Sequence, residues 1–419
     1  MTTRWNGWGE ESVTYPLSRQ ARDYLENILG KQSHIEDAHI EDVLRIIPES
    51  NLPSHPNINT GRIDRLRHSR GQSLPDWIDL RYGTITKFTD GVAQPGNDRD
   101  VEELIRFCYT HDINLIPYGG GTSVLGHINP VQSIRPSITI DTARLLSITG
   151  FDEKTNVAII GAGIKGPNLE SSLNARGYTL GHFPQSFEQS TLGGWLATRS
   201  CGQQSALYGR IEDMVHDIHI QTPVGSYTVH AFPKSAAGPD LSHVILGSEG
   251  RAGIITQASM IIHPLPEYEA FYGYFFREWE NGLEAVREIT QKKIPVSMLR
   301  LSDPEETEIT LLLSGKEKLL HWADRGLRWL NYKKHRCLLI AGFSEQTYMS
   351  YKTNQKWASS VIRQHGGINT GKFIGHQWVK NRFTTPYLRN TLWENGFAID
   401  TLETALEWSM ITSAVIEIK

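Results

Sequence analysis

The sequence predicts an α+β protein of two or more domains, and three observations support this class. With 419 residues, the chain exceeds what one hydrophobic core usually holds. Hydrophobic residues make up 39% and charged residues 21%, which are ordinary proportions for a folded globular protein. From Thr84 to Pro266 short apolar runs alternate with glycine-rich turns, whereas longer strand and helix patterns follow.

Charge, cysteine usage and hydropathy exclude several classes of function. A net charge of -4 gives no basic surface for nucleic acid, so we expect a small-molecule partner instead. Cys108, Cys201 and Cys337 are far apart and form no C-x-x-C, which argues against a disulfide framework and a metal site. We find neither a signal peptide nor a run of about 18 apolar residues, and therefore expect a cytoplasmic protein.

The first segment, residues 1–83, is polar and is predicted to be a short helical accessory segment. Its apolar periodicity indicates helices over 17–29 and 40–47. A loop rich in Pro, Asn and His follows over 49–59.

The middle region, residues 84–266, is predicted to be a mixed α+β domain. Two helices are expected, over 99–111 and 167–176. Short β-branched and aromatic runs bounded by turn residues predict the strands. These strands are 114–120, 137–142, 156–163, 217–223, 226–231, 243–248 and 254–266.

The last region, residues 267–419, interleaves strands and helices and is predicted to be an α/β layer. The expected strands are 269–276, 296–302, 308–315 and 337–343, and the expected helices are 280–293, one through Leu330, and 345–365. The final run "ETALEWSMITSAVIEIK" has helical spacing up to Lys419 without a glycine cap. We therefore expect this region to stop inside an element.

One glycine motif has the spacing of a nicotinamide-binding turn. In "NVAIIGAGIKGPNLE" an apolar run leads into Gly161, Gly163 and Gly166. A dinucleotide fold requires a second strand that ends in Asp or Glu about 20 residues later, and "GYTLGHFPQSFEQS" does not provide one. The motif is better interpreted as a strand-to-helix turn with Pro167 at the first helical position.

A second glycine loop, "PYGGGTSVLG", follows the apolar run "INLI". Three consecutive glycines leave successive backbone N–H groups uncovered, and Thr122 and Ser123 add hydroxyls, which suits a diphosphate. Without a P-loop lysine, nucleoside triphosphate hydrolysis is disfavoured. Taken alone, the loop is equally compatible with a tight surface turn.

Two further segments favour the diphosphate interpretation. Residues 184–209, "PQSFEQSTLGGWLATRSCGQQSALYG", combine hydroxyls, glycines and an arginine with little apolar periodicity. Residues 238–260 place Gly247, Gly250 and Gly253 before a strand. Several such loops on one strand-rich domain are typical of a site for a large, extended, phosphate-containing cofactor.

The order of these motifs resembles the flavin-binding domain of the vanillyl-alcohol oxidase superfamily, and within it the alkyldihydroxyacetone-phosphate synthase family. The stretches that carry the resemblance are "RWNGWG", "PYGGGTSV", "QSFEQSTLGGWLATR", "YGRIEDMV" and "GPDLSHVILGSEG". The resemblance implies a two-subdomain FAD-binding PCMH-type domain followed by an incomplete α/β cap domain. It also implies FAD as the cofactor.

The resemblance implies three groups of cofactor-binding residues. The diphosphate would be cradled by Pro117, Tyr118, Gly119, Gly120, Gly121, Thr122 and Ser123. The flavin and ribityl side would be lined by Gln185, Ser186, Phe187, Glu188, Gln189, Ser190, Thr191, Thr198, Arg199, Ser200 and Cys201. The adenosine half would meet backbone groups of Glu249, Gly250, Arg251, Ala252, Gly253, Ile254 and Ile255. No histidine stands in the glycine loop, so FAD is expected to be noncovalent, and His127 is interpreted as an ordinary polar residue.

Two arginines match positions that the resembled family uses at its active site. Arg300 is in "SMLRLSD", and Arg389 in "TPYLRN" would bind the substrate phosphate, for which a guanidinium fork is suited. Without the resemblance, each would be interpreted as a solvated or ion-paired residue.

The implied reaction replaces the acyl group of acyl-dihydroxyacetone phosphate with a long-chain alcohol through an adduct at flavin N5. The family's catalytic tyrosine and histidine-rich motif would lie beyond Lys419, so we expect this chain to be incomplete for catalysis. Two alternatives stay open: an FAD-linked oxidase or dehydrogenase of a 2-hydroxy acid such as lactate or glycolate, and a noncatalytic flavin-binding fragment. A homodimer and peripheral membrane contact through Trp5 and Trp8 are further expectations.

Overall fold

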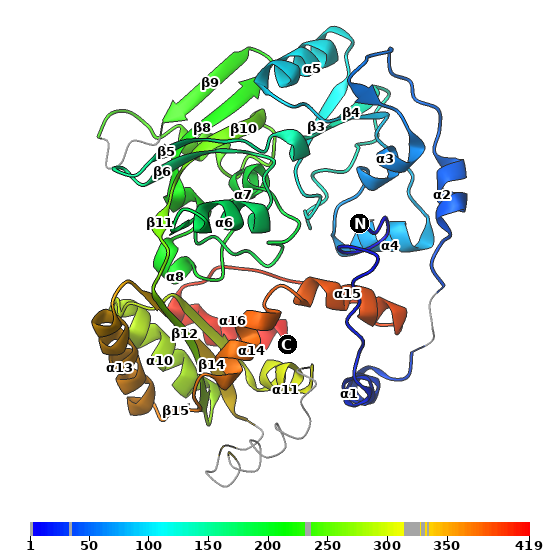
Figure 1. Ribbon diagram of the computed structural model, residues 1–419. Coiled ribbons are helices and arrows are strands. Elements are labelled where there is room, and N and C mark those ends of the chain that lie inside the picture. Colours follow the sequence, from blue (N-terminus) through cyan, green and yellow to red (C-terminus); the bar gives the residue numbers. More distant parts are fainter. Residues whose placement is uncertain (1–2, 33–35, 231–235, 314–326, 328–331, 333–334) are drawn as a thin grey trace. The chain divides into compact units, whose positions relative to one another are not determined.

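The computed structural model describes residues 3–32, 36–230, 236–313, 327, 332 and 335–419 (Figure 1). The chain divides into two compact units, each assembled from stretches that are distant in the sequence. The first unit is Met1–Tyr15, His34–Leu265 and Asn381–Asn395, and the second is Pro16–Ser33, Pro266–Lys380 and Gly396–Lys419. The predicted α+β class is confirmed. The segment boundaries expected after residues 83 and 266 stay predictions.

A small sheet in the first unit delivers the glycine-rich loop. Its strand order is β1-β2-β4-β3. The strands are β1 (Ile58–Asn59), β2 (Gly91–Ala93), β3 (Asn114–Tyr118) and β4 (Ser137–Asp141). Strands β2 and β3 run parallel to β4, and helix α5 (Asp98–Thr110) connects β2 to β3. The carboxyl ends of parallel strands are where open α/β sheets bind ligands, and the glycine loop begins at such an end.

A larger sheet in the same unit is antiparallel throughout, in the order β5-β6-β10-β8-β9. Its strands are β5 (Ile148–Asp152), β6 (Val157–Gly161), β8 (Val215–Thr222), β9 (Gly225–His230) and β10 (Ile254–Ile261). A two-stranded ribbon pairs β7 (Tyr178–Thr179) with β11 (His263–Pro264).

The strand that precedes the G-x-G-x-x-G motif is β6, and it lies between antiparallel neighbours. A nicotinamide-binding turn requires a parallel sheet, so the fold agrees with the scaffold interpretation of these glycines. A Cβ on Gly163 would overlap the carbonyl oxygen of Thr142, and one on Gly161 that of Leu145. Helix α6 (Gly166–Asn174) follows with a proline in its first turn, as predicted.

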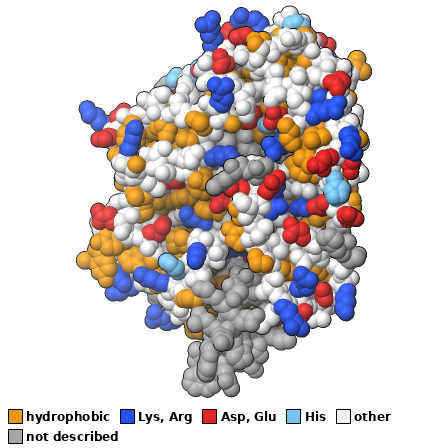
Figure 2. Space-filling view, turned by 45° about the vertical axis from the view of Figure 1, so that its right-hand side comes forward, with side chains coloured by type: hydrophobic (Ala, Val, Ile, Leu, Met, Phe, Trp, Pro, Cys, Tyr) orange, Lys and Arg blue, Asp and Glu red, His pale blue; other side chains and the backbone are white. Residues whose placement is uncertain are grey.

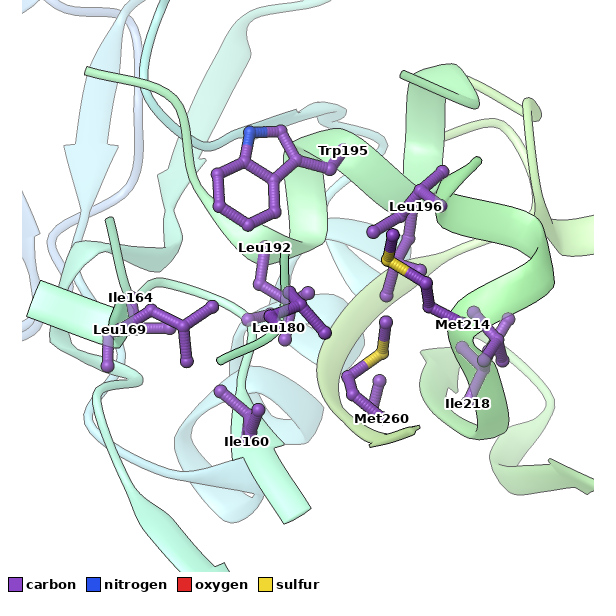
Figure 3. Packing of buried hydrophobic residues seen from close by; sticks show 14 of the residues in the cluster. Ile160, Ile164, Leu169, Leu180, Leu192, Trp195, Leu196, Met214, Ile218 and Met260 are labelled. Atoms are coloured by element: carbon purple, nitrogen blue, oxygen red, sulfur yellow. The ribbon is translucent and has the colours of Figure 1, made fainter. Parts of the chain in front are cut away.

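The main core of the first unit lies between the larger sheet and the helices α6 and α7 (Leu192–Thr198). Figure 3 shows Leu180 and Leu192 at its centre, with Ile164 on one side and Met260 on the other. Both leucines are fully buried. This core therefore holds α7, and with it the loop that precedes α7.

The remaining elements of the first unit are short. They are α2 (Ile40–Ile46), α3 (Arg62–Arg67), α4 (Leu74–Tyr82), α8 (Ser205–Tyr208), α9 (Ser242–Ile245), α15 (Thr385–Glu394) and the 3-10 turns η1 (Thr142–Arg144) and η2 (Ile211–Met214). Helix α4 begins at a capping box, in which the side chains of Ser73 and Asp76 each accept from the other's backbone N–H.

The second unit is built on one antiparallel sheet, in the order β13-β14-β12-β15. Its strands are β12 (Tyr268–Phe276), β13 (Met298–Ser302), β14 (Cys337–Glu345) and β15 (Ile368–Asn369). Its helical elements are α1 (Arg19–Leu29), α10 (Trp279–Gln291), α11 (Pro304–Leu313), α13 (Tyr348–Gln364), η3 (Trp408–Met410) and α16 (Ile411–Ile418). Helix α14 (Phe373–Asn381) belongs to it except for its last residue.

Two strands expected from the sequence are helices instead. The first half of 243–248 lies on α9, and most of 308–315 lies on α11. At the start of α11 the carboxylate of Asp303 accepts from the backbone N–H groups of Glu305 and Glu306, which is an N-cap that outweighs the apolar run behind it. The helix expected through Leu330 lies outside the described residues.

The two tryptophans expected to contact a membrane, Trp5 and Trp8, both pack against hydrophobic clusters. The indole of Trp8 is buried, and Trp5 packs against a hydrophobic cluster. Within the described residues, no helix combines the length and apolar character needed to cross a bilayer. On the face drawn in Figure 2, basic and acidic side chains are interspersed.

Candidate cofactor and substrate site

The glycine loop after β3 is a cradle that side chains would fill. A Cβ on Gly119 would overlap the hydroxyl of Thr191, and one on Gly120 would overlap the carbonyl oxygen of Gln189. Gly121 has φ +68°, and a Cβ there would overlap the hydroxyl of Tyr118. Both the backbone conformation and the lack of space therefore require glycine. Within the described residues, no backbone hydrogen bond is donated by the N–H groups of residues 120–122. The loop therefore fits a diphosphate.

The second loop, residues 185–191, is fixed in front of α7. The hydroxyl of Thr191 caps the helix by accepting from the N–H of Gly194 at 3.3 Å. The indole of Trp195 donates to the hydroxyl of Ser190 at 2.7 Å. Lys165 donates to the side-chain oxygen of Gln189 at 3.0 Å. Because Gly119 and Gly120 lie directly against this loop, the first two predicted segments form one surface.

The turn at residues 249–255 joins the same surface. The N–H of Glu249 donates to the carbonyl of Ala197 in α7 at 2.9 Å, and a Cβ on Gly250 would lie 2.9 Å from the ring of Pro117. The side chains of Ile254 and Ile255 are buried in the cores. Only backbone atoms of these two residues are left for a cofactor, as the sequence interpretation supposed.

The segment 198–201 follows α7 and turns sharply. Arg199 adopts a left-handed conformation at φ +50°, and its guanidinium contacts the ring of His243 at 3.0 Å. The hydroxyl of Ser200 meets Nε2 of His182 at 2.5 Å. Cys201 is exposed. His243 and His182 therefore hold this segment at the end of α7.

His127 links the first and third loops. Its Nδ1 lies 3.1 Å from the hydroxyl of Ser123 and 3.7 Å from the carboxylate of Glu249. Burial lowers the pKa of His127, although Glu249 opposes this shift. A polar bridge of this kind agrees with the structural role expected for His127.

Helix α15 supplies site residues that the sequence analysis did not single out. Phe383, just before the helix, stacks on Phe187 with ring centroids 4.6 Å apart. The hydroxyl of Tyr387 lies near Glu188 and Gln189 of the second loop, and both side chains act on its pKa. Burial, together with Glu188, raises the pKa of Tyr387 to about 12, so its hydroxyl stays protonated at neutral pH. The run "FTTPYLRN" gave no signal beyond its arginine.

Arg389 lies on the same helix and is connected to the first loop. Its Nη1 donates to the carbonyl of Gln72 at 2.6 Å, and its guanidinium lies 4.4 Å from the ring centroid of Trp77. The N–H of Gln72 in turn donates to the carbonyl of Ser123 at 2.6 Å. The structure therefore brings Arg389 together with the predicted diphosphate loop.

Arg300 has a different environment in the second unit. It lies on β13, and its Nη2 is 2.7 Å from the carboxylate of Glu306. Both side chains are about half exposed, at 48% and 42%. This is the geometry of a surface ion pair, so an active-site role for Arg300 stays a prediction.

His182 is a further residue that the sequence analysis did not select. It is fully buried, and burial lowers its pKa to about 3. Its Nδ1 has no hydrogen-bond partner in the described part of the chain. Its ring centroid lies 4.9 Å from that of Trp195, and its Nε2 meets Ser200, so the ring lies next to the segment 198–201. Its position directly before the second loop, in "GHFPQS", is a signal that could have indicated it.

Comparisons with known proteins define the class to which this site belongs. Residues 89–229 match the FAD binding domain, and residues 265–419 match the C-terminal domain of FAD linked oxidases. The chain therefore carries the two domains of an FAD-linked oxidase, and FAD is its cofactor.

Relatives narrow this class. The alkyldihydroxyacetonephosphate synthase of Dictyostelium discoideum is 31% identical over 411 residues, which are 96% of this chain and 66% of that protein. The same enzyme of Caenorhabditis elegans is 28% identical and covers 99% of this chain, which spans 76% of it. A solved alkyldihydroxyacetonephosphate synthase superposes with a TM-score of 0.83 at 29% identity, covering 94% of this chain and 78% of that one. The chain is a homologue of the alkyldihydroxyacetonephosphate synthases.

Proposed function

We propose that this chain is an FAD-dependent ether-lipid synthase that exchanges the acyl group of acyl-dihydroxyacetone phosphate for a long-chain alcohol. The observation that carries the proposal is the connection of Arg389 to Ser123 through Gln72. A cation that can bind a phosphate is thereby fixed beside the loop that fits the cofactor's diphosphate. The names of the relatives supply the substrate class.

The residues of this chain have separate tasks in the proposed reaction. The backbone N–H groups of residues 119–122 bind the diphosphate, and the turn at residues 249–255 meets the adenosine half. When bound, noncovalently, FAD supplies the reactive isoalloxazine ring on which the exchange depends. Phe187 and Phe383 form a stacked apolar wall that excludes water beside the second loop.

Arg389 serves the substrate phosphate, and Tyr387 of the same helix lies beside the second loop. The planar guanidinium of Arg389 forms a fork of N–H donors that matches two phosphate oxygens at once, which an ammonium group does not. Burial and Glu188 raise the pKa of Tyr387 to about 12, so its hydroxyl lies beside the second loop as a neutral group even in mildly alkaline solution.

Three measurements on the FAD-reconstituted protein test the function. In the first, labelled hexadecanol and palmitoyl-dihydroxyacetone phosphate are incubated with the chain, and formation of labelled ether lipid supports the proposal. In the second, loss of the flavin's long-wavelength absorption on adding D-lactate would replace it with a 2-hydroxy acid dehydrogenase. In the third, a chain that stays colourless after incubation with FAD would leave only a noncatalytic fragment.

Arg389→Lys isolates the proposed phosphate contact, because it keeps the charge and removes the fork. We expect dihydroxyacetone phosphate to bind at least about tenfold more weakly, which corresponds to about 1.4 kcal/mol. Arg300→Lys makes the same change in the second unit and tests the other predicted arginine. Homodimer formation and peripheral membrane contact are further parts of this proposal, measurable by light scattering and by vesicle flotation.

A further inference from the structure

The N-terminal motif "RWNGWG" forms a small hairpin, residues 3–10, that the proposed function does not yet use. Thr3 and Glu10 form an antiparallel bridge, and the N–H of Arg4 donates to the carbonyl of Gly9 at 2.9 Å. The guanidinium of Arg4 donates to the carbonyls of Glu11 and Val13, each at 3.2 Å. These contacts give the hairpin, which lies at the label N in Figure 1, a defined structure.

One side chain of α15, that of Asn390, makes two hydrogen bonds to this hairpin. Asn390 accepts from the N–H of Trp8 at 3.0 Å and donates to the carbonyl of Trp8 at 2.9 Å. Asn390 is only 3% exposed. A buried amide that satisfies a donor and an acceptor of one residue fixes both position and orientation, because misplacing it would leave two buried polar groups unpaired.

The two glycines of the motif are shaped to receive α15. A Cβ on Gly7 would lie 2.5 Å from the side-chain oxygen of Asn390. Gly9 has φ +73°, and a Cβ there would overlap the ring of Tyr387. Both glycines are therefore required by close approach of the hairpin to the helix.

The hairpin also touches Gln72, the residue to which Arg389 is bonded. The side chain of Gln72 donates to the carbonyl of Gly7 at 3.4 Å and accepts from the indole of Trp77 at 2.8 Å. Its backbone accepts from Arg389 and donates to Ser123. Gln72 is therefore connected to the hairpin, the arginine and the glycine loop together.

We propose that the N-terminal hairpin is a clasp that positions Arg389 for its phosphate. Asn390 acts as a positioning residue, because it fixes α15 one residue away from the arginine and has no contact with the cofactor loops among the described hydrogen bonds. Gln72 completes the clasp from the opposite side. This inference rests on the proposed function, since it assumes that Arg389 binds the phosphate of the substrate.

The experiment measures binding of dihydroxyacetone phosphate through the change it causes in the absorption of the bound flavin. Asn390→Ala removes the clasp from the helix side, and Gly7→Ala strains it from the hairpin side if the first variant does not fold. Asn395→Ala is the matched control, because Asn395 donates to the carbonyl of Thr391 at the C-terminal end of α15, five residues beyond Asn390. FAD affinity, from fluorescence quenching, and the unfolding midpoint are recorded for every variant.

We expect Asn390→Ala and Gly7→Ala to weaken dihydroxyacetone phosphate binding at least about tenfold, whereas Asn395→Ala changes it less than about threefold. In an Arg389→Met background, Asn390→Ala should have no further effect, because a positioning residue acts only through the group it positions. A purely structural contribution of Asn390 would still weaken binding in the Arg389→Met background.

Three results separate the possible failures. If Arg389→Met weakens binding and the clasp variants do not, the clasp is wrong and the proposed function stands. If Arg389→Met itself binds as wild type, the phosphate role of Arg389 fails, and the clasp proposal fails with it. If Asn395→Ala weakens binding as much as Asn390→Ala, or if the effects of Asn390→Ala and Arg389→Met simply add, the hairpin serves only stability.

Discussion

Gly120 lies directly against the main chain of Gln189, so that a Cβ on Gly120 would stand 2.7 Å from the carbonyl carbon of Gln189. The contact joins two loops that are separated in the sequence by the strands β4 to β7 and by helix α6. Neither loop can move independently of the other. The cofactor surface is therefore one packed layer rather than a set of separate turns.

Gly120→Ala should disrupt this layer. The new methyl group has to displace backbone atoms of the second loop, which we expect to cost about 1–3 kcal/mol of stability and to weaken FAD binding at least about tenfold. Fluorescence quenching of FAD and urea unfolding measure the two effects. Gly96→Ala is the control, because its nearest neighbour would be 3.5 Å away. Equal FAD affinity in the two variants would contradict the assignment of this loop.

His182 should make stability depend on pH in the acid range. Burial lowers its pKa to about 3 in the folded chain, against 6.5 ordinarily. Between these values the unfolded chain binds a proton that the folded chain does not. The free energy of unfolding should therefore fall as the pH is lowered from about 6.5 towards 3, by up to about 1.4 kcal/mol per pH unit.

Urea unfolding at a series of pH values tests the His182 prediction. His182→Gln should flatten the slope in this window, because glutamine does not titrate, and above about pH 7 the histidine should add no slope. The exposed His111 provides the matched control His111→Gln. A slope in His182→Gln identical to that of the wild type would disprove the prediction.

The three cysteines should differ in reactivity. Cys108 and Cys337 are buried, and burial raises the pKa of each thiol to about 12, whereas Cys201 is exposed. At pH 8 a disulfide reagent such as Ellman's reagent should therefore titrate one thiol in the native chain and all three after denaturation. In Cys201→Ser the native signal should vanish. Because Cys201 borders the predicted flavin side, bound FAD should slow its reaction with the reagent. A second thiol that reacts fast in the native chain would contradict the burial of Cys108 and Cys337.

Thr191 should stabilise α7 through its hydroxyl. Thr191→Val keeps the shape and removes the group that accepts from Gly194, so the cap is lost. We expect a cost of about 0.5–2 kcal/mol in urea unfolding. Thr191→Ser retains the hydroxyl and is the matched control. If Thr191→Ser were as destabilising as Thr191→Val, keeping the hydroxyl would not preserve the helix, and the cap would not explain the effect.

Much of the fold could be predicted because its periodic elements are long. The helix expected over 99–111 is α5, and the strand expected over 156–163 contains β6. The errors arose where local signals compete. In α11 the apolar run Leu311–Leu313 was interpreted as a strand. The Asp303 cap and the acidic first turn stabilise a helix there instead. Helix α9 has only four residues, too few for a periodicity to be read.

The candidate site could be predicted in part. The glycine loops could be predicted because close approach of backbone segments requires glycine, which shows in the sequence. The partners Asn390 and Tyr387 were not, since their roles depend on contacts with Trp8 and Glu188, which are far away in the sequence. A single buried amide or hydroxyl has no pattern of its own until the chain has folded.

The pairing of Trp8 with Asn390 also sets an order of events during synthesis. The two residues are separated by 382 positions. At a translation rate of about 5–20 residues per second, the hairpin leaves the ribosome roughly 20–75 s before its partner is made. Its indole must spend that interval without its final neighbours, exposed to chaperones and to other nascent chains. Helix α15 is thus translated long after the hairpin that it has to close over.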